Sequence, residues 1–202
     1  MSRLSLALLF SLLFPVQSFA GNLETQADHD ALRKLKSEVT VAANSRDYPA
    51  MQKLLHQPFM VTLITQDNFT DFGKLKDYFE SLYTRDTLRM KNVSLAAEAD
   101  DLSQIYQGTF ALTKGSTKEH YELMDGRSFD LDGRWTAVSI KDNSEWKLLA
   151  VHTGTNFLDN PVLNAIEKSV VWFGVVGAIG GLIIGFGAGW FFTKKRAGKS
   201  AA

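Results

Sequence analysis

The 202-residue chain contains no cysteine and only four histidines. Without cysteine it can form no disulfide, thiolate nucleophile or cysteine-ligated zinc site, so its folded part must be stabilised by an apolar core alone. The histidines show neither HxxxH nor HExxH spacing, and the sequence has neither a GxxxxGK[ST] phosphate loop nor a GxSxG nucleophile motif. We therefore expect no metal, no bound cofactor and none of the enzyme classes that these motifs define.

The chain also lacks net charge, because 22 basic residues balance 22 acidic ones. This balance is uneven along the sequence. Five of the basic residues lie in residues 1–20 and 193–202, so residues 21–168 hold five more acidic than basic side chains. Because binding to nucleic-acid phosphates requires a basic face, we expect no nucleic-acid partner.

Residues 1–20 have the layout of a cleavable signal peptide. Arg3 precedes an apolar run from Leu4 to Phe14, Pro15 follows, and Ser18-Phe19-Ala20 places small residues at the two positions that signal peptidase reads. The apolar run is shorter than the roughly 20 residues that span a bilayer. We therefore predict export of the following residues, with an uncleaved anchor helix as the alternative.

A longer apolar run occurs near the C-terminus, where the 23 residues from Val170 to Phe192 carry no charge. At about 1.5 Å per residue, such a helix crosses a hydrocarbon core of roughly 30 Å. Trp172 and Trp190 lie near its ends, where indole rings favour the headgroup region, and residues 193–202 form a basic tail. The sequence predicts a juxtamembrane segment at 159–169, a single-pass transmembrane helix at 170–192 and a cytoplasmic tail. The preceding domain would lie outside the cytoplasm, which is the periplasm in a bacterium.

Glycines recur every four residues in this apolar run, at Gly177, Gly181, Gly185 and Gly189. Glycines at this spacing form a groove that lets the backbone of another helix approach closely, so that packing and Cα–H···O contacts hold the two helices together. We expect the groove to support a homodimer or the binding of another membrane protein. The alternative is that glycine is simply common in membrane helices.

The region between the two ends begins with helical patterns. Apolar residues spaced by three and four predict helices at residues 24–46 and 48–55. A β-branched stretch predicts a strand at 59–65, and a further helix follows that Thr70 or Asp71 can cap.

After Asp86 the apolar period changes to 2, which is typical of strands. Strands are predicted at residues 88–98, 104–113, 120–125, 134–141 and 145–153. Turns are predicted between them, including Lys114-Gly115-Ser116 and Asp132-Gly133. Helices followed by strands indicate one α+β domain at residues 21–158, with the helices packed on one face of a curved antiparallel sheet.

The order of these elements, together with the closing stretch GRWTAVSIKDNSEWKLLAVHTGTN at residues 133–156, resembles the NTF2-like superfamily and especially its SnoaL-like branch. The residues that carry the resemblance are Arg134, Thr136, Trp146, Lys147, Leu148 and His152. The resemblance implies a cone-shaped half-barrel with a pocket between sheet and helices, and frequent dimerisation through the sheet. Some ketosteroid-isomerase-like relatives are isomerases or cyclases that use pocket carboxylates, whereas many relatives only bind ligands or assemble. Fold therefore does not decide function.

Five side chains are candidates for lining this pocket: Arg134, His152, Tyr121, Tyr106 and Asp130. Each tyrosine or aspartate has the simpler interpretation of a solvated strand residue or a ring anchored in the core. Arg134 shares a strand face with Val138 and Ile140, and an arginine on an apolar face must be paired or bind an anion.

His152 requires separate consideration because it is the candidate general base. Strict alternation places it on one face with Trp146, Leu148 and Ala150, at the end of an apolar row. A general base needs a partner within hydrogen-bond reach, and the sequence identifies none. A structural or pocket-lining role for His152 is therefore the simpler interpretation.

From these features we expect a membrane-anchored extracytoplasmic domain that is not an enzyme. It would bind a small apolar ligand or a protein partner, and it would dimerise through its sheet and its glycine-bearing helix. The alternative is an isomerase- or cyclase-like enzyme that uses acid/base residues in the cone pocket. An open cavity with at least two converging ionisable groups would favour the enzyme, and a cavity filled by Phe, Leu and Trp side chains would exclude it.

Overall fold

The computed structural model describes residues 17–199. Most of the predicted signal peptide therefore lies outside the described residues, and residues 17–20 form the start of the first helix. The elements in chain order are α1 Gln17–Ser45, α2 Tyr48–Leu54, β1 Leu55–Thr62, β2 Asn68–Phe69, α3 Phe72–Thr84, β3 Met90–Ala99, β4 Gln104–Tyr106, β5 Phe110–Leu123, β6 Ser128–Asp142, β7 Glu145–Thr155 and α4 Pro161–Lys199.

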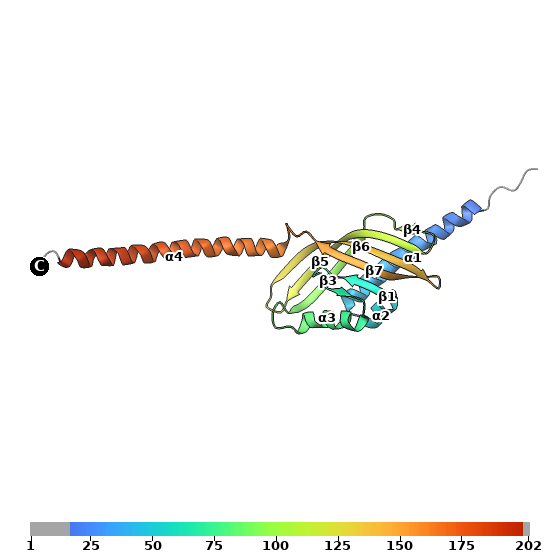
Figure 1. Cartoon of the computed structure of the whole chain (residues 1–202), viewed down its shortest axis with the longest axis horizontal. Helices are drawn as coiled ribbons and strands as arrows, with labels where there is room; N and C mark the ends of the chain where they lie inside the picture. Colours follow the sequence, from blue (N-terminus) through green and yellow to red (C-terminus); the bar gives the residue numbers. More distant parts are fainter. Residues whose placement is uncertain (1–16, 200–202) are drawn as a thin grey trace, which may run out of the picture.

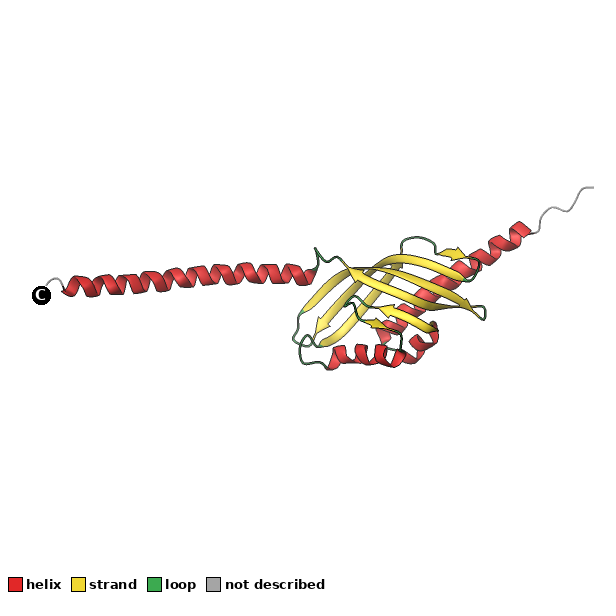
Figure 2. Cartoon of the chain, in the orientation of Figure 1, coloured by secondary structure: helices red, strands yellow, loops and turns green. Residues whose placement is uncertain are grey.

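The strands form one curved seven-stranded sheet, and α1, α2 and α3 cover one of its faces (Figures 1 and 2). The strand order is β2-β1-β7-β6-β5-β3, with β4 pairing to the start of β5. All neighbouring strands are antiparallel except β1 and β7, which are parallel. The predicted α+β architecture is thus confirmed, and the sheet is mixed rather than wholly antiparallel.

Two clusters of buried apolar residues hold the helices on the sheet. The larger cluster joins β1, α3 and the closing strands and contains Leu55, Phe59, Val61, Leu75, Trp135, Ala137 and Leu148. The smaller cluster joins α1 to the sheet and contains Leu32, Leu35, Ala111 and Trp146. Burying each large apolar side chain contributes about 1.5 to 3 kcal/mol, so these clusters supply the stability that disulfides supply in many exported domains.

The start of α3 shows which of the two candidate caps is used. The side chain of Asp71 accepts a hydrogen bond from the backbone N–H of Lys74 at 2.9 Å. This bond satisfies one of the unpaired N–H groups of the first turn and places a negative charge at the positive end of the helix. Asp71, rather than Thr70, is therefore the N-cap.

Two glycines that predict turns lie instead inside long strands, so the turn predictions at Lys114-Gly115-Ser116 and Asp132-Gly133 were wrong. A Cβ on Gly115 would lie 2.0 Å from the carbonyl oxygen of Glu98 and 2.5 Å from the ring of Trp135. A Cβ on Gly133 would lie 2.3 Å from the hydroxyl of Thr117. Glycine is required at both positions because neighbouring atoms occupy the space that a side chain would fill.

A bulge in β7 changes which side chains face the helices. Leu148 pairs with Ser139 and Ala150 pairs with Val138, so Leu149 is an extra residue without a partner on β6. After an extra residue, alternate side chains exchange faces. The expectation that His152 shares a face with Leu148 was therefore wrong. His152 is exposed on the outer face of the sheet.

Side chains of α1 cover the β3 edge of the sheet. The amide of Asn44 donates to the carbonyl oxygen of Leu95 at 2.8 Å and accepts from its N–H at 2.7 Å. The Lys36 ammonium donates to the carbonyl oxygen of Ala97 at 2.7 Å. The backbone groups that an edge strand leaves unpaired are thus partly satisfied by a helix.

α4 projects from one end of the domain (Figure 1). Its segment Ile166–Trp190 is long and apolar enough to cross a membrane, and no part of that segment is buried against the domain. This candidate span overlaps most of the predicted transmembrane helix at residues 170–192. The helix itself continues without interruption from the juxtamembrane segment into the basic tail.

Candidate functional site

A cavity of about 510 Å³ lies between the helices and the inner face of the sheet. Its deeper lining is almost wholly apolar. The apolar residues come from α1, α2, β1, α3, β6 and β7 and include Leu35, Val39, Met51, Val61, Leu75, Phe79, Trp135, Ala137, Leu148 and Val151. A cavity of this size lined by such side chains is suited to a small apolar molecule.

Ionisable side chains line the cavity in one region only, which we call the charged rim. Its members come from residues 29–36 of α1 and from the end of β3 with the loop that follows: His29, Arg33, Lys36, Glu98, Asp100 and Asp101. Lys36 joins the two segments, because its ammonium lies 3.4 Å from a carboxylate oxygen of Glu98. The cavity is therefore charged in one region and mostly apolar elsewhere.

Most charges of the rim are engaged with one another or with neighbours. Arg33 forms an ion pair with Asp30 one helical turn earlier. The guanidinium of Arg134 binds both carboxylate oxygens of Asp100, one of them at 2.9 Å. This hydrogen bonding lowers the pKa of Asp100 below its ordinary value, so Asp100 remains ionised and paired.

His29 differs from the other rim residues because its Nδ1 atom is buried without a hydrogen-bond partner among the described residues. A buried polar atom without a partner is costly, and a ligand or a water molecule with one polar group could supply the missing bond. His29 is thus the rim residue with a polar atom that a ligand could bind.

Asp28, the residue before His29, connects α1 to the hairpin formed by β6 and β7. Its carboxylate accepts hydrogen bonds from Lys141 Nζ at 2.7 Å and from Trp146 Nε1 at 2.9 Å. Burial works to raise the pKa of Asp28, but the two hydrogen bonds outweigh it and the pKa lies below the ordinary value. A carboxylate held in this way is structural rather than a free acid or base.

A second polar network involves Tyr121, on the inner face of β5. The Tyr121 hydroxyl donates to one carboxylate oxygen of Glu119, and the Thr117 hydroxyl donates to the other at 3.0 Å. Burial, followed by the charge of Glu119, raises the pKa of Tyr121, so its hydroxyl stays protonated. Thr117 also lines the cavity, so the network reaches the cavity wall.

None of the five pocket candidates named from the sequence belongs to the cavity lining. Arg134 lies on the outer face of β6 and reaches Asp100 at the sheet edge. Asp130 is also on the outer face, where it accepts from His120 at 2.6 Å. Tyr106 is half exposed on β4 and donates to Gln104 at 2.9 Å. His152 is turned outward by the bulge, and Tyr121 touches the cavity only through its network.

The sequence reasoning missed the residues that form the rim and its supports. Asp28 did carry a signal, because it precedes Leu32 by four residues and so continues the buried stripe of α1. A carboxylate in such a stripe needs a buried partner. Glu119 and Thr117 carried a signal of the same kind, since they alternate with Tyr121 on one strand face.

Among the residues that the structure describes, no group of three or more histidine and carboxylate side chains could hold a metal ion. Three of the four repeated glycines of α4, Gly181, Gly185 and Gly189, border a groove together with Leu182, Phe186 and Trp190. This groove lies on the candidate membrane span, away from the domain.

Comparison with known proteins identifies the fold but no relative with a similar sequence. No family model matches the chain, and no curated protein matches its sequence. The crystal structure of a type 2 hexachlorocyclohexane dehydrochlorinase (LinA) superposes with a TM-score of 0.58 at 11% identity, covering 67% of this chain and 90% of that chain. The type 3 enzyme from Novosphingobium barchaimii LL02 gives 0.55 at 11% identity, covering 67% and 91%.

A third structure is an uncharacterized protein with a cystatin-like fold from Caulobacter vibrioides, with a TM-score of 0.52 at 12% identity, covering 70% of this chain and 96% of that chain. The domain thus has the NTF2-like, cystatin-like fold that the sequence predicted, and it carries a C-terminal apolar helix that is a candidate membrane span. Because this fold occurs in enzymes and in proteins without a known activity, function must be argued from the side chains.

Proposed function

We propose that this protein is a membrane-anchored, extracytoplasmic ligand-binding protein without catalytic activity. Its NTF2-like domain holds a small molecule with an apolar body and one polar group. The cavity is open and carries several ionisable groups at its charged rim, which taken alone would favour an enzyme. The observation that carries the proposal is that most of these charges are paired and that the rest of the lining is mostly apolar. The Nδ1 atom of His29, which is buried without a partner in the part of the chain that the structure describes, supports a single polar group on the ligand.

Photocrosslinking tests this function in the protein's own environment. The full chain would be reconstituted in liposomes with a diazirine-bearing palmitic acid, irradiated and digested, and the modified peptides identified by mass spectrometry. We expect adducts on cavity residues of β6 and β7. Adducts confined to α4 would contradict the proposal.

Two alanines on neighbouring strands provide matched variants for this experiment. Ala137 is buried and lines the cavity, whereas Ala150 lies on the outer face of the sheet beside Val138. We expect Ala137→Phe to reduce domain adducts at least fivefold because the ring fills the cavity, and Ala150→Phe to leave them unchanged. Thermal unfolding of both variants shows whether each remains folded.

The anchoring part of the proposal rests on the Ile166–Trp190 segment and on the basic residues that follow it. The domain would lie outside the cytoplasm and the tail inside. Protease added to intact spheroplasts or cells should digest the domain and spare an epitope on the tail. The reverse pattern would overturn this topology.

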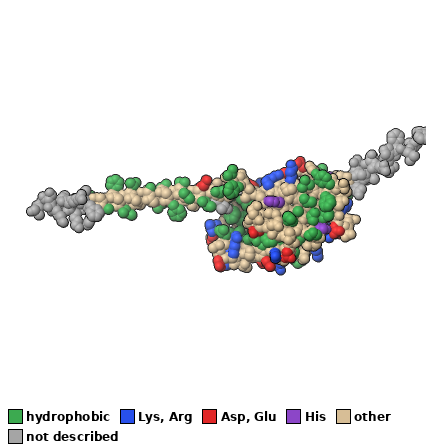
Figure 3. Space-filling model, in the orientation of Figure 1, with side chains coloured by type: hydrophobic (Ala, Val, Ile, Leu, Met, Phe, Trp, Pro, Cys, Tyr) green, Lys and Arg blue, Asp and Glu red, His purple; other side chains and the backbone are tan. Residues whose placement is uncertain are grey.

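We also propose that the protein forms a homodimer. A row of apolar side chains crosses the outer face of the sheet in register: Met60, Ala150, Val138 and Leu112. Met60 is 51% exposed and Leu112 is 39% exposed. Figure 3 shows hydrophobic side chains gathered over the domain surface on the side away from α4. Together with the glycine groove of α4, this face gives two surfaces on which a second copy can pack.

The second candidate function is an isomerase- or cyclase-like activity, and the network of Thr117, Glu119 and Tyr121 is the observation that favours it. A half-buried carboxylate beside a protonated phenol is an arrangement that can remove a proton next to a carbonyl group. Deuterium exchange of the activated C–H groups of cyclic ketones, followed by NMR, tests this alternative. Exchange that Glu119→Gln abolishes would favour the enzyme, and absence of exchange would favour ligand binding alone.

A further inference from the structure

The end of the domain from which α4 emerges carries exposed apolar side chains on three separate segments. Leu88 in the loop between α3 and β3 is 52% exposed, and Met124 in the turn between β5 and β6 is 61% exposed. Phe157 and Leu158, in the linker before α4, are 80% and 85% exposed. All three segments lie at the α4 end in Figure 1, and we call these four residues the juxtamembrane face.

Local bonds hold this face in place. Leu88 has a φ of 51°, a left-handed conformation that is costly for a leucine. Two arginines fix the loop around it: Arg85 Nε donates to the carbonyl oxygen of Leu88 at 2.9 Å, and Arg89 Nε donates to that of Arg85 at 2.9 Å. The backbone N–H of Met124 donates to the carbonyl oxygen of Arg89 at 2.9 Å, which joins the loop to the turn.

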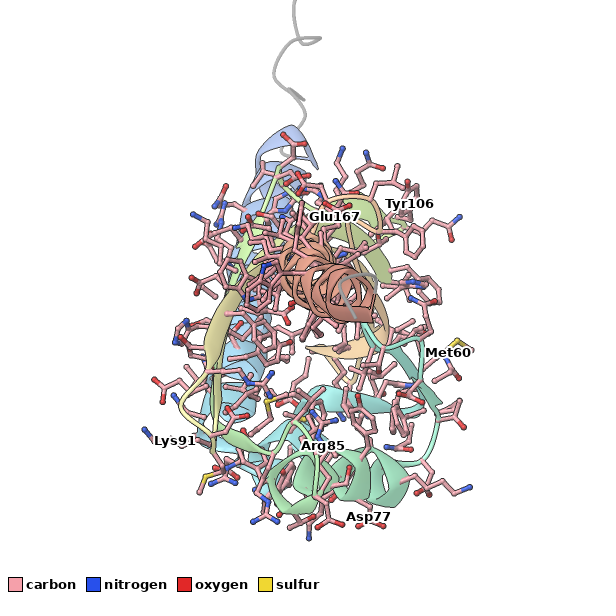
Figure 4. The ribbon with its side chains drawn as sticks, turned by 90° about the vertical axis from the view of Figure 1, so that its left-hand side faces the viewer. Met60, Asp77, Arg85, Lys91, Tyr106 and Glu167 are labelled. Carbon is pink, nitrogen blue, oxygen red and sulfur yellow. The ribbon has the colours of Figure 1, made fainter. Side chains whose placement is uncertain are left out.

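The linker keeps this face close to any membrane that α4 crosses. β7 ends at Thr155 and α4 begins at Pro161, so only residues 156–160 are non-helical. Five extended residues span at most about 18 Å. The candidate span starts at Ile166, a little more than one helical turn after Pro161. Figure 4 looks along α4 onto this end of the domain, with Arg85 and Lys91 labelled.

At this end of the domain, charges contribute less than apolar side chains to the attraction to a lipid surface. Three basic residues here already have carboxylate partners: Arg89 with Asp86 at 3.9 Å, Lys91 with Glu122 at 3.4 Å and Arg127 with Asp125 at 2.7 Å. Neutral pairs of this kind attract anionic lipid weakly. Apolar side chains at loop tips, flanked by arginines with long apolar stems, are suited to the boundary between headgroups and acyl chains.

We propose that the juxtamembrane face docks on the bilayer that α4 crosses, with Leu88 and Met124 inserted at the level of the headgroups. The domain is then held against the membrane at two places, by α4 and by its own loops, and its orientation is fixed. This inference rests on the proposed anchoring through α4.

Single-cysteine labelling tests the docking directly, because the chain contains no cysteine of its own. Leu88→Cys and Met124→Cys would carry an NBD fluorophore in the full chain, reconstituted in phosphatidylcholine nanodiscs with or without a lipid spin-labelled near its headgroup. Leu102→Cys is the matched control, since Leu102 is an equally exposed leucine (59%) in the loop between β3 and β4, at the other end of the domain. We expect at least threefold stronger quenching at positions 88 and 124 than at 102.

Ile179→Cys separates the docking from the anchoring, and because it lies near the middle of the candidate span it is probed with a second lipid, spin-labelled near the end of its acyl chain. A chain quenched at 179 but no more at 88 and 124 than at 102 overturns the docking and leaves the anchoring intact. A chain that is not quenched at 179 overturns both.

Discussion

Asp28 is the residue on which the attachment of α1 to the closing hairpin depends most. Its carboxylate neutralises Lys141 and accepts from the indole of Trp146, and its side chain is only 9% exposed. α1 also supplies His29, Lys36 and much of the apolar cavity wall. A loss of this attachment would therefore disturb the cavity as well as the core.

We expect Asp28→Asn to lower the free energy of unfolding by about 2 to 3 kcal/mol, because it removes the charged acceptor of two hydrogen bonds. Urea denaturation of the full chain in detergent, followed by tryptophan fluorescence, measures this loss. Asp30→Asn is the control, since the Asp30 side chain is 61% exposed and pairs with Arg33 and Gln26 on the same helix. Equal stability of the Asp28 variant and the parent would contradict the structural role.

The pH dependence of this contribution follows from the direction of the pKa shift. The pKa of Asp28 is lower in the folded protein than its ordinary value of 3.8, so ionised Asp28 stabilises the fold at all pH values above about 4. This contribution is lost as the pH falls through the folded pKa. The difference in free energy of unfolding between Asp28→Asn and the parent should therefore be smaller below pH 3 than at pH 7. Denaturation curves at the two pH values measure it.

The roles of individual side chains could be predicted from the sequence only in part. The expectation that Arg134 must be paired or bind an anion agrees with its bond to Asp100, but a partner 34 positions away cannot be identified from strand periodicity. The role of Asp28 could have been inferred from its place in the apolar stripe of α1. Its partners could not, because they lie on strands more than 100 residues later.

Gly115 shows how a single residue controls an element. We expect Gly115→Ala to lower the melting temperature by several degrees, since the added methyl group would meet the backbone of Glu98, which cannot move without breaking the pairing of β3. Gly154→Ala is the matched control on β7, where a Cβ meets nothing within 4 Å. Circular dichroism melts of both variants provide the comparison, and equal melting temperatures would contradict the packing argument.

At the scale of elements, the bulge at Leu149 determines which face of β7 lines the cavity. Leu148 lies before it and Val151 and Thr153 lie after it, and all three line the cavity. If the same residues alternated strictly, with Leu149 paired like its neighbours, Val151 would face outward and His152 inward. The bulge therefore places Val151 and Thr153 on the same face as Leu148.

We expect deletion of Leu149 to preserve photocrosslinking in the cavity, because the strand then alternates regularly from Leu148 to Ala150 and keeps Val151 on the cavity face. Leu149→Ala keeps the bulge and shortens only the side chain, so crosslinking should persist. The two variants would be compared in the same liposome assay. Loss of cavity adducts from a deletion variant that remains folded would contradict the assignment of Leu149 as the extra residue.

Most elements could be predicted from the sequence because helical and strand periods differ clearly on the two sides of Asp86. Bulges and close approaches could not, since they depend on the strand that lies opposite. Gly115 is an example: its sequence neighbours predict a turn, and only the ring of Trp135 and the carbonyl group of Glu98 explain the glycine. The parallel pairing of β1 with β7 likewise joins segments that are far apart in the chain.

At the scale of the whole molecule, the proposed dimer would use two surfaces that the membrane holds in one orientation. Each surface alone is small. Confinement to one bilayer raises their effective concentration, so two weak contacts can together give a stable dimer. The contributions of the two surfaces can be separated by mutation.

We expect Gly181→Leu with Gly185→Leu, or Met60→Lys with Leu112→Lys, to reduce the dimer fraction in liposomes about tenfold, and the four changes together to give monomers. Single-molecule photobleaching counts the subunits. Gly180→Leu with Gly187→Leu is the control, because these glycines lie off the four-residue repeat. A parent chain that is monomeric would overturn the dimer proposal as a whole.

The coverage of β3 by α1 has a consequence for how this protein avoids aggregation. A domain without disulfides folds among other chains, where open sheet edges can recruit strands from unfolded neighbours. One edge of this sheet is the two-residue strand β2, which is too short to act as a template. At the other edge, Asn44 engages both backbone groups of Leu95. Protection from amyloid-like growth is thus provided by α1, so a chain that has lost this helix would expose a β3 edge able to recruit other chains.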